Sequence, residues 1–288
     1  MNFHSVSYGP GERQNFDILF SENRNPHAII YIHGGAYFTG NKFQYPSFLL
    51  NYARNNIFAT IDYRVLEDNN DIHMDDILSD LNDAVSKIVE LSDSNGINIK
   101  DLILIGHSAG GNIGLLYGYR YPQKIKKTAA CISLAGPTDF TDDIAWSSMT
   151  MWGKNLKERL SFLSIMGSRL TGHKIELYQK NWTKQKDYSM FRNNIMDISP
   201  ISFVHKSSYI PPTLLIHARD DDQVPYSNSI RLNTILDGTS IPHKLLTPDK
   251  KGNSHMLGGE INAYNSPINF GNQVWVKETE KWMEGYLL

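Results

Sequence analysis

The chain has 288 residues and a mass of 32.8 kDa, a length that suits one large domain or two small ones and allows a sizeable core. Its 28 basic and 30 acidic residues leave a formal net charge of −2, so we find no electrostatic basis for binding nucleic acid or an anionic membrane. The single cysteine, Cys131, excludes an intramolecular disulfide, and its apolar neighbours predict a buried thiol.

The N-terminal stretch MNFHSVSYGPGERQNF has neither a basic start nor an apolar core, and so predicts no signal peptide. No uninterrupted apolar run approaches the ~20 residues that a membrane span needs. We therefore expect a cytoplasmic protein that does not bind membranes.

Short apolar runs recur along the chain and predict strands. The first, at 15–20, alternates at period two, as a half-buried strand does. Near-continuous apolar runs, typical of parallel strands covered on both faces, follow at 28–33, 57–63, 102–106, 131–136 and 213–218, and 243–247 predicts one more.

Amphipathic stretches between these runs predict helices. A first helical stripe combines Ile77, Leu81, Ala84, Val85, Ile88 and Leu91. A second combines Ile230, Leu232, Ile235 and Leu236, and Gly238 is expected to end that helix. A last helix is expected to use Trp275, Trp282 and Tyr286. Strands alternating with helices predict an α/β fold with a mostly parallel central sheet, whose functional residues gather at the carboxyl ends of the strands.

The segment from about 140 to 200 has no clear strand but many large apolar residues, among them Trp146, Trp152 and Trp182. A loop of that length without structure of its own would be unusual in a compact domain. We interpret it as a helical cap inserted into a single domain that spans 1–288. The alternative is that its helices simply cover one face of the sheet.

A possible nucleophile lies where the run at 102–106 ends. Gly106-His107-Ser108-Ala109-Gly110 fits G-x-S-x-G between a predicted strand and a predicted helix. Glycines allow a strained turn that presents Ser108, and the Ala109 N–H at the helix N-terminus would face developing negative charge. The alternative is a tightly packed turn with a serine there by chance.

A serine hydroxyl needs a base, and the base needs an orienting acid. His255 lies in the glycine-bearing loop KGNSHMLGG before the last predicted helix. Asp220, Asp221 and Asp222 directly follow the run at 213–218. The chain order Ser, Asp, His is the one expected when such a site is built on an open α/β sheet.

At this loop the chain resembles the α/β-hydrolase esterase/lipase superfamily, in which a similar segment reads His-Gly-x-x-Asp-x-x-Val-Pro. Aligning His217 and Val224-Pro225 with that segment implies Asp221 as the catalytic acid and Asp222 as the second choice. His217 itself is expected to be structural.

A second glycine-rich element, HGGAYFTGN, starts at His33 after the run at 28–33. Acyl transfer needs a further N–H on the oxyanion, and glycines let the backbone approach it. The element is similar to the His-Gly-Gly-x oxyanion loop of esterases related to hormone-sensitive lipase, carboxylesterases and arylformamidases. That resemblance implies that His33 braces the loop and that Gly34 and Gly35, with Ala36 as a third candidate, join Ala109 in the oxyanion hole.

Together these elements predict a serine hydrolase that cleaves small carboxylic esters with short-chain or aryl acyl groups. Two alternatives stay open: an arylformamidase or other amide hydrolase, and a non-catalytic ligand-binding protein of the same fold. We see no metal-binding or dinucleotide motif, and expect neither metal nor cofactor. The cap or the last helix could form a homodimer.

Overall fold

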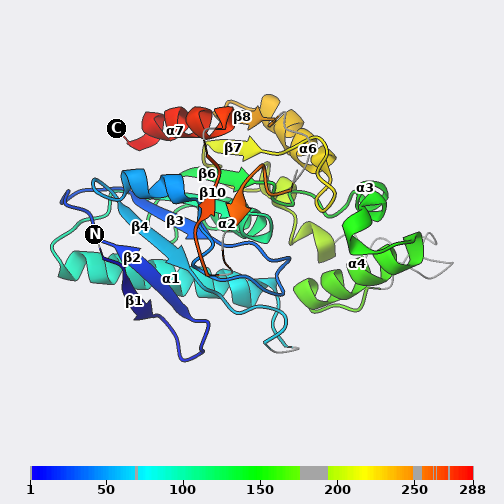
Figure 1. Cartoon of the computed structure of the whole chain (residues 1–288), viewed down its shortest axis with the longest axis horizontal. Helices are drawn as coiled ribbons and strands as arrows, with labels where there is room; N and C mark the ends of the chain where they lie inside the picture. The colour runs from blue at the N-terminus through cyan, green and yellow to red at the C-terminus, as the bar shows by residue number, and fades with distance from the viewer. Residues whose placement is uncertain are drawn as a thin grey trace.

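A mostly parallel β-sheet forms the centre of the molecule (Figure 1). The structure, a computed structural model, describes residues 2–68, 71–175, 194–248, 255–261, 263, 265–271 and 273–287. Within these residues the main sheet has eight strands in the order β1-β2-β4-β3-β5-β6-β7-β8. Their bounds are β1 His4–Ser7, β2 Asn15–Leu19, β3 Ala28–Ile32, β4 Ile57–Ile61, β5 Leu102–His107, β6 Thr128–Leu134, β7 Thr213–Ile216 and β8 His243–Leu246.

Strands β3 to β8 pair in parallel, whereas β1, β2 and β4 pair antiparallel at one edge. Every residue of β3 and of β5 is buried, because helices cover both faces of a parallel sheet. The apolar runs therefore predicted these strands correctly, and the α/β fold class is confirmed. Sequence reasoning missed β1, since its residues HSVS are mostly exposed and carry no apolar pattern.

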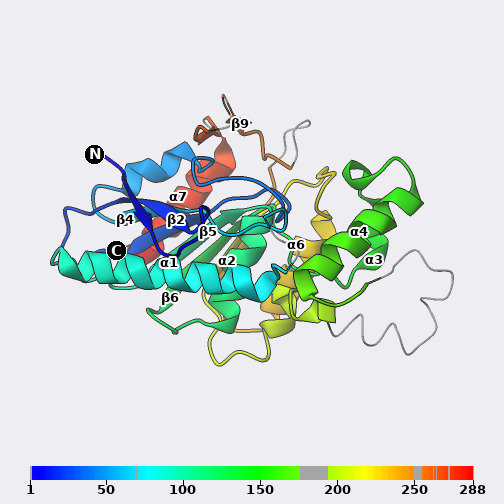
Figure 2. The ribbon, with the colours of Figure 1, turned by 90° about the horizontal axis from the view of Figure 1, so that it is seen from below.

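Helices cover the two faces of the sheet as separate layers (Figures 1 and 2). Helices α1 (Met74–Ser94), α2 (Ala109–Arg120) and α6 (Tyr226–Asp237) contribute to the core on one face. The short 3-10 helix η1 (Ser47–Tyr52) and the C-terminal helix α7 (Val274–Leu287) contribute to the core on the other face.

The side chains of β3 alternate between the two cores on either face of the sheet. Ile30 and Ile32 lie in the first core, the one beneath α1, α2 and α6. Ile29 and Tyr31 lie in the second core, the one beneath η1 and α7, because successive side chains of a strand point to opposite faces. Full burial of an aliphatic side chain contributes about 1.5–3 kcal/mol. Packing on both faces therefore makes the central strands a rigid support for the loops at their ends.

The predicted helical faces are confirmed with one exception. The residues of the α1 stripe that lie in the first core are Ile77, Leu81, Ala84, Val85 and Ile88, with Leu91 packed at its margin. In α7, Trp275 is buried, and Trp282 and Tyr286 pack against the second core. In α6 the interpretation is wrong for Ile230, which is 41% exposed. It lies two residues from Leu232, about 200° around the helix, and so faces away from the sheet.

Helices follow β6 in the segment expected to be a cap. These are α3 (Asp143–Ser148), the 3-10 helix η2 (Thr150–Trp152), α4 (Leu156–Thr171) and, shortly before β7, the 3-10 helix η3 (Pro200–Phe203). Helices α3 and α4 lie at the end of the molecule opposite both termini (Figures 1 and 2). Residues 176–193, with Trp182, lie outside the described residues, so a cap spanning about 140–200 stays a prediction.

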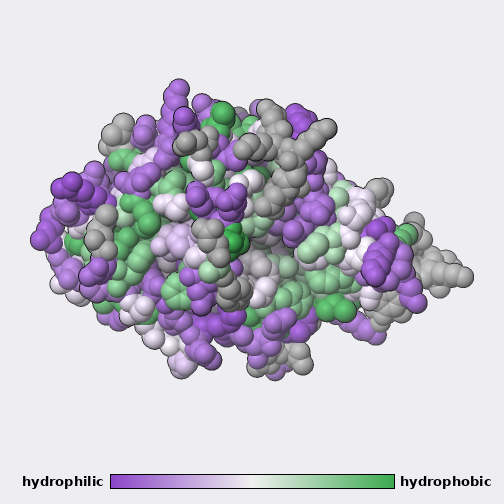
Figure 3. Space-filling model, in the orientation of Figure 1, coloured by the Kyte–Doolittle hydropathy of each residue, from purple (hydrophilic) through white to green (hydrophobic). Residues whose placement is uncertain are grey.

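Apolar side chains are exposed on η2 and α4, where Met151, Leu156 and Ile165 each show more than half of their surface. Figure 3 shows apolar atoms in this region among a largely polar surface. None of the helices within the described ranges combines the length and the hydropathy that crossing a bilayer requires.

The sheet register places the glycine-rich loops side by side. Ile32 of β3 pairs with Gly106 of β5, and His107 pairs with Leu134 of β6. The loops leaving β3 and β5 therefore start next to each other at the carboxyl edge of the sheet, and the loop after β7 leaves the same edge two strands away. Open α/β sheets bind their ligands at this edge.

Candidate active site

Ser108 occupies a strained turn between β5 and α2. Its backbone has φ 53° and ψ −122°, and a non-glycine residue with positive φ persists only where its surroundings hold it. Here the Ser108 N–H donates to the carbonyl oxygen of Leu134 at 2.8 Å, and α2 begins at the next residue. The predicted strand–turn–helix setting is present.

Two glycines let the elements around the turn approach. A Cβ on Gly106 would lie 2.1 Å from the carbonyl oxygen of Gly110, and a Cβ on Gly110 would lie 2.1 Å from that of Ile32. Both distances are far below van der Waals contact. The glycines of the motif are therefore required by close packing of α2 against β3 and β5.

Ser108, His255 and Asp221 form one hydrogen-bonded chain. His255 Nε2 lies 2.9 Å from Ser108 Oγ, and His255 Nδ1 lies 2.8 Å from Asp221 Oδ2. The serine O–H donates to Nε2, and the Nδ1–H donates to the carboxylate. All three residues are at least nine-tenths buried, although 147 residues separate the serine from the histidine along the chain.

Asp221 is held as a carboxylate by several donors. Its Oδ1 accepts the backbone N–H groups of Gln223 and Val224 at 2.8 and 2.9 Å. Burial alone would raise the pKa of Asp221, but hydrogen bonds from His217 and His255 outweigh it and hold that pKa far below its usual range. Asp222, the second choice, has an exposed side chain, and it is Asp221 that meets His255.

The loop after β3 abuts the serine. A Cβ on Gly34 would lie 3.1 Å from Ser108 Cβ and 3.0 Å from the carbonyl oxygen of His107. Gly35 has φ 117°, and a Cβ there would lie 2.1 Å from the carbonyl oxygen of Thr39. Only glycine fits at Gly35, and any side chain at Gly34 would press on the serine.

Gly34 of this loop lies against Ser108, and Ala109 follows Ser108 in the chain. Among the residues that the structure describes, none accepts a hydrogen bond from the N–H of Gly34, Gly35 or Ala109. Ala109 N–H is the first amide of α2, where the helix dipole favours negative charge. These amides are the ones that the sequence assigned to an oxyanion hole; that role stays a prediction.

His33 links the loop to the sheet. Its Nδ1–H donates to the carbonyl oxygen of Gly34 at 2.7 Å, and its ring stacks on Tyr63 with centroids 4.2 Å apart. The Tyr63 hydroxyl donates back to the His33 carbonyl at 2.9 Å. Burial lowers the pKa of His33 to about 4, so the ring is neutral at pH 7.

Sequence reasoning assigned no role to His107, although it lies beside the nucleophile. Its Nε2–H donates to the backbone carbonyl of His255 at 2.9 Å, and burial lowers the pKa of His107 to about 4. The neutral ring thus anchors the segment that carries His255. No local pattern could have indicated this contact, which joins residues 148 positions apart.

Residues of η2 and α4 contact the loop after β7, which carries Asp221, and reach the loop after β3. Trp152 Nε1–H donates to the carbonyl oxygen of Gln223 at 2.8 Å, next to the triad acid. The Trp152 ring stacks on Phe162 of α4 at 4.6 Å, and Phe162 in turn lies 6.2 Å from Phe38 of the β3 loop. This segment therefore touches both the loop after β3 and the loop that carries Asp221.

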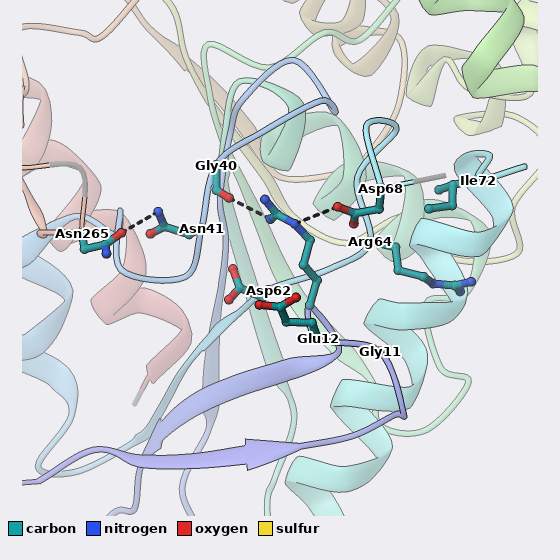
Figure 4. A pocket seen from close by; sticks show the side chains of 10 residues that line it. Gly11, Glu12, Gly40, Asn41, Asp62, Arg64, Asp68, Ile72 and Asn265 are labelled. Atoms are coloured by element: carbon teal, nitrogen blue, oxygen red, sulfur yellow. Dashed lines mark hydrogen bonds and ion pairs between the residues drawn. The ribbon is translucent and has the colours of Figure 1, made fainter. Parts of the chain in front are cut away.

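A polar cavity of about 730 Å³ lies at the far end of the β3 loop (Figure 4). Arg13 donates to the carbonyl oxygen of Gly40 at 2.9 Å and pairs with Asp68 at 3.2 Å. The lining residues are Gly11, Glu12, Arg13, Gly40, Asn41, Asp62, Arg64, Asp68, Ile72 and Asn265. Ser108, Asp221 and His255 are not among these lining residues, so the cavity is separate from the candidate site. In the described ranges no three His, Cys, Asp or Glu side chains are grouped so that they could hold a metal ion.

Comparison with known proteins shows the family and the fold of the chain. A family model described as BD-FAE matches residues 16–236, most of the chain and all of the sheet from β2 to β7. The chain belongs to the BD-FAE family. Over 150 residues this BD-FAE protein is 24% identical to 2-hydroxy-6-oxo-2,4-heptadienoate hydrolase of Pseudomonas putida. That match covers 48% of the chain and 53% of the relative, about half of its length.

Several solved structures resemble the BD-FAE protein more completely. Est2, an esterase of Thermogutta terrifontis, aligns with a TM-score of 0.65 and 16% identity over 99% of this chain and 91% of its own. Esterase B of Lactobacillus rhamnosis aligns with a TM-score of 0.65 and 15% identity over 99% and 85%. A truncated carbohydrate esterase from gut microbiota aligns with a TM-score of 0.62 and 19% identity over 85% and 87%. These likenesses confirm the predicted α/β-hydrolase fold.

Proposed function

We propose that the protein is a serine hydrolase that cleaves small carboxylic esters through an acyl-enzyme. The observation that carries this proposal is the unbroken chain of hydrogen bonds from Ser108 Oγ through His255 to Asp221, at 2.9 and 2.8 Å. A serine linked in this way to a base and an oriented acid has the arrangement required of an activated nucleophile.

In the acylation step, Ser108 Oγ attacks the ester carbonyl while His255 Nε2 takes its proton. Asp221 keeps the proton of His255 on Nδ1 and stabilises the positive charge that forms on the ring. The amides of Ala109, Gly34 and Gly35 donate to the oxyanion. Each such donor contributes about 3–4 kcal/mol of transition-state stabilisation in comparable enzymes.

His255 then returns its proton to the leaving alcohol, and the tetrahedral intermediate collapses to the acyl-enzyme. A water molecule deprotonated by the same Nε2 attacks the acyl carbonyl, which releases the acid and restores Ser108. The backbone carbonyl of His255, held by His107, keeps the ring in place through both steps.

The names of the structural neighbours, among them a carbohydrate esterase and two further esterases, support ester rather than amide cleavage. The substrates that we propose are esters of short-chain or aryl acids. A non-catalytic relative would have no need of the strained backbone at Ser108 or of the buried carboxylate at Asp221.

Fluorophosphonate labelling tests the proposal. The native protein should be labelled and should hydrolyse p-nitrophenyl acetate or butyrate, whereas Ser108→Ala should do neither. Ser92→Ala is the matched control, because Ser92 is also buried but lies in α1 and donates only to Ile88. Absence of labelling in the native protein, or equal labelling of Ser108→Ala, would refute the mechanism. Faster turnover of N-formylkynurenine than of every ester would show an amide hydrolase instead.

A further inference from the structure

A second histidine contacts the carboxylate of the triad. His217 follows β7, and its Nε2 lies 3.1 Å from Asp221 Oδ2, the same oxygen that faces His255. The same Nε2 lies 3.1 Å from the carbonyl oxygen of Val224. The side chains of His217 and Asp221 are fully buried, so solvent does not weaken the contact.

The partners of His217 determine which nitrogen carries its proton. A carboxylate and a carbonyl can only accept hydrogen bonds, so Nε2 must be a donor shared between them. Nδ1 lies 2.7 Å from Ser229 Oγ, and this hydroxyl can donate to it. A neutral ring with its proton on Nε2 therefore satisfies every contact of His217.

With His217 included, both oxygens of Asp221 are constrained. Oδ1 accepts two backbone N–H groups, and Oδ2 accepts His217 and His255. The two backbone N–H groups and His217 fix the plane of the carboxylate. The remaining lone pair of Oδ2 is directed at His255. An acid held this way restricts the orientation of the base that it supports.

We propose that His217 is a positioning residue for the hydrolysis, acting through Asp221 by donating from Nε2 to Oδ2; this rests on the proposed function. This hydrogen bond also weakens the interaction between Asp221 and the protonated ring of His255. A hydrogen bond from His217 withdraws part of the negative charge that Oδ2 offers to the protonated ring of His255. Losing that donor would leave more of the charge for His255, so the protonated base would be more stable.

The titratable groups that face His217 come from four elements. They are Asp221 of its own loop, His255 after β8, His107 at the end of β5 and Tyr226 at the start of α6, whose ring lies 5.6 Å away. Of these groups, Asp221 touches His217 directly and also holds His255, so Asp221 and His255 are the pair that responds to a change at position 217.

Two amide substitutions distinguish the role of His217 Nε2 from that of Nδ1. A glutamine amide nitrogen overlies histidine Nε2 and can reach Asp221, whereas an asparagine amide overlies Nδ1 and can reach only Ser229. We expect His217→Gln to keep kcat/KM for p-nitrophenyl acetate within about threefold and to keep the native pH profile. We expect His217→Asn to lose about tenfold or more, as for one lost charge-assisted hydrogen bond, and to move the acid limb of the profile to higher pH.

His243→Asn is the control for the same change at a histidine of β8, since the His243 ring hydrogen-bonds to Ile241 and Asp237, neither of which belongs to the site. It should keep the native profile. A native profile for His217→Asn, or equal losses at all pH values in both position-217 variants, would overturn the inference. If instead the native protein is neither labelled nor active, the proposed function itself has failed. A position-217 variant that does not fold would count against a role confined to positioning.

Discussion

The substitution Gly110→Ala tests whether close approach of α2 to β3 is what presents the nucleophile. The new Cβ would lie 2.1 Å from the carbonyl oxygen of Ile32 and 2.5 Å from that of His33. Real Cβ contacts essentially never fall below 3.0 Å, so helix and strand would have to separate by at least 0.9 Å, the difference between 3.0 Å and 2.1 Å. Backbone atoms on both sides leave no flexible side chain to absorb this change.

The expected effect follows from that displacement. Overpacking of this kind costs about 1–3 kcal/mol of folding free energy, or more when backbone must move. The same shift carries the Ala109 N–H and Ser108 away from the loop after β3. A misplacement of about 1 Å in a catalytic group can cost roughly 10²-fold in rate, so kcat/KM should fall by that factor.

Gly114→Ala is the matched control in the same helix. A Cβ there would meet only the Cδ1 end of Ile32 at 3.3 Å and Leu104 Cβ at 3.8 Å. Because alanine is favoured over glycine in a helix by about 1 kcal/mol, this variant should be as stable as the native protein or more so, and fully active. Urea unfolding and hydrolysis of p-nitrophenyl acetate measure both quantities. If the two variants were equally stable and active, the steric explanation of the motif would be wrong.

Three further outcomes are expected. Asp221→Asn should lower kcat by roughly 10⁴-fold, as when the acid of a comparable triad is neutralised, whereas Asp222→Asn, at an exposed side chain, should leave it within about twofold; similar losses in both would contradict the assignment. Burial raises the pKa of Asp62 to about 6, so ionisation destabilises the fold above that pH and this penalty disappears as the pH falls to about 4. Asp62→Asn should therefore be more stable than the native protein at pH 8, by at most about 3 kcal/mol, and urea titrations should show the difference closing between pH 6 and 4; a difference independent of pH would argue against it. Trp152→Phe removes the donor to Gln223 and should lower the free energy of unfolding by about 1 kcal/mol, seen as a lower melting temperature; an unchanged melting temperature would show that the contact is weak.

Local patterns predicted the sheet and the turn well, because both depend on neighbouring residues. The buried strands are continuous apolar runs, and the α1 stripe repeats at helical spacing. Ile230 shows the limit of this reasoning. It is apolar and lies near the right positions, but the orientation of α6 on the sheet leaves it 41% exposed. The edge strand β1 was missed since its exposed residues need no apolar pattern.

The candidate site likewise has features that the sequence predicts and contacts that it does not. The glycines around Ser108 and after His33 could be recognised from the sequence as sites of tight turns, because tight turns and close backbone approach exclude other side chains. The choice of Asp221 over Asp222 came from a resemblance, and the structure places the Oδ2 of Asp221 2.8 Å from His255 Nδ1. The contacts of His107 with the His255 carbonyl and of His217 with Asp221 could not be read from the chain.

What the sequence determined by itself was therefore most strands of the main sheet, the helices that cover them and the residue types of the candidate site. Propensity, period and turn chemistry act over a few residues, and they are sufficient for that. The sequence had already indicated His255 among its ten histidines, whereas only the tertiary structure brought His107 against the carbonyl oxygen of His255 and His217 against Asp221. Those contacts depend on β3, β5 and β7 ending at one edge of the sheet, an outcome of strand order and of packing between distant segments.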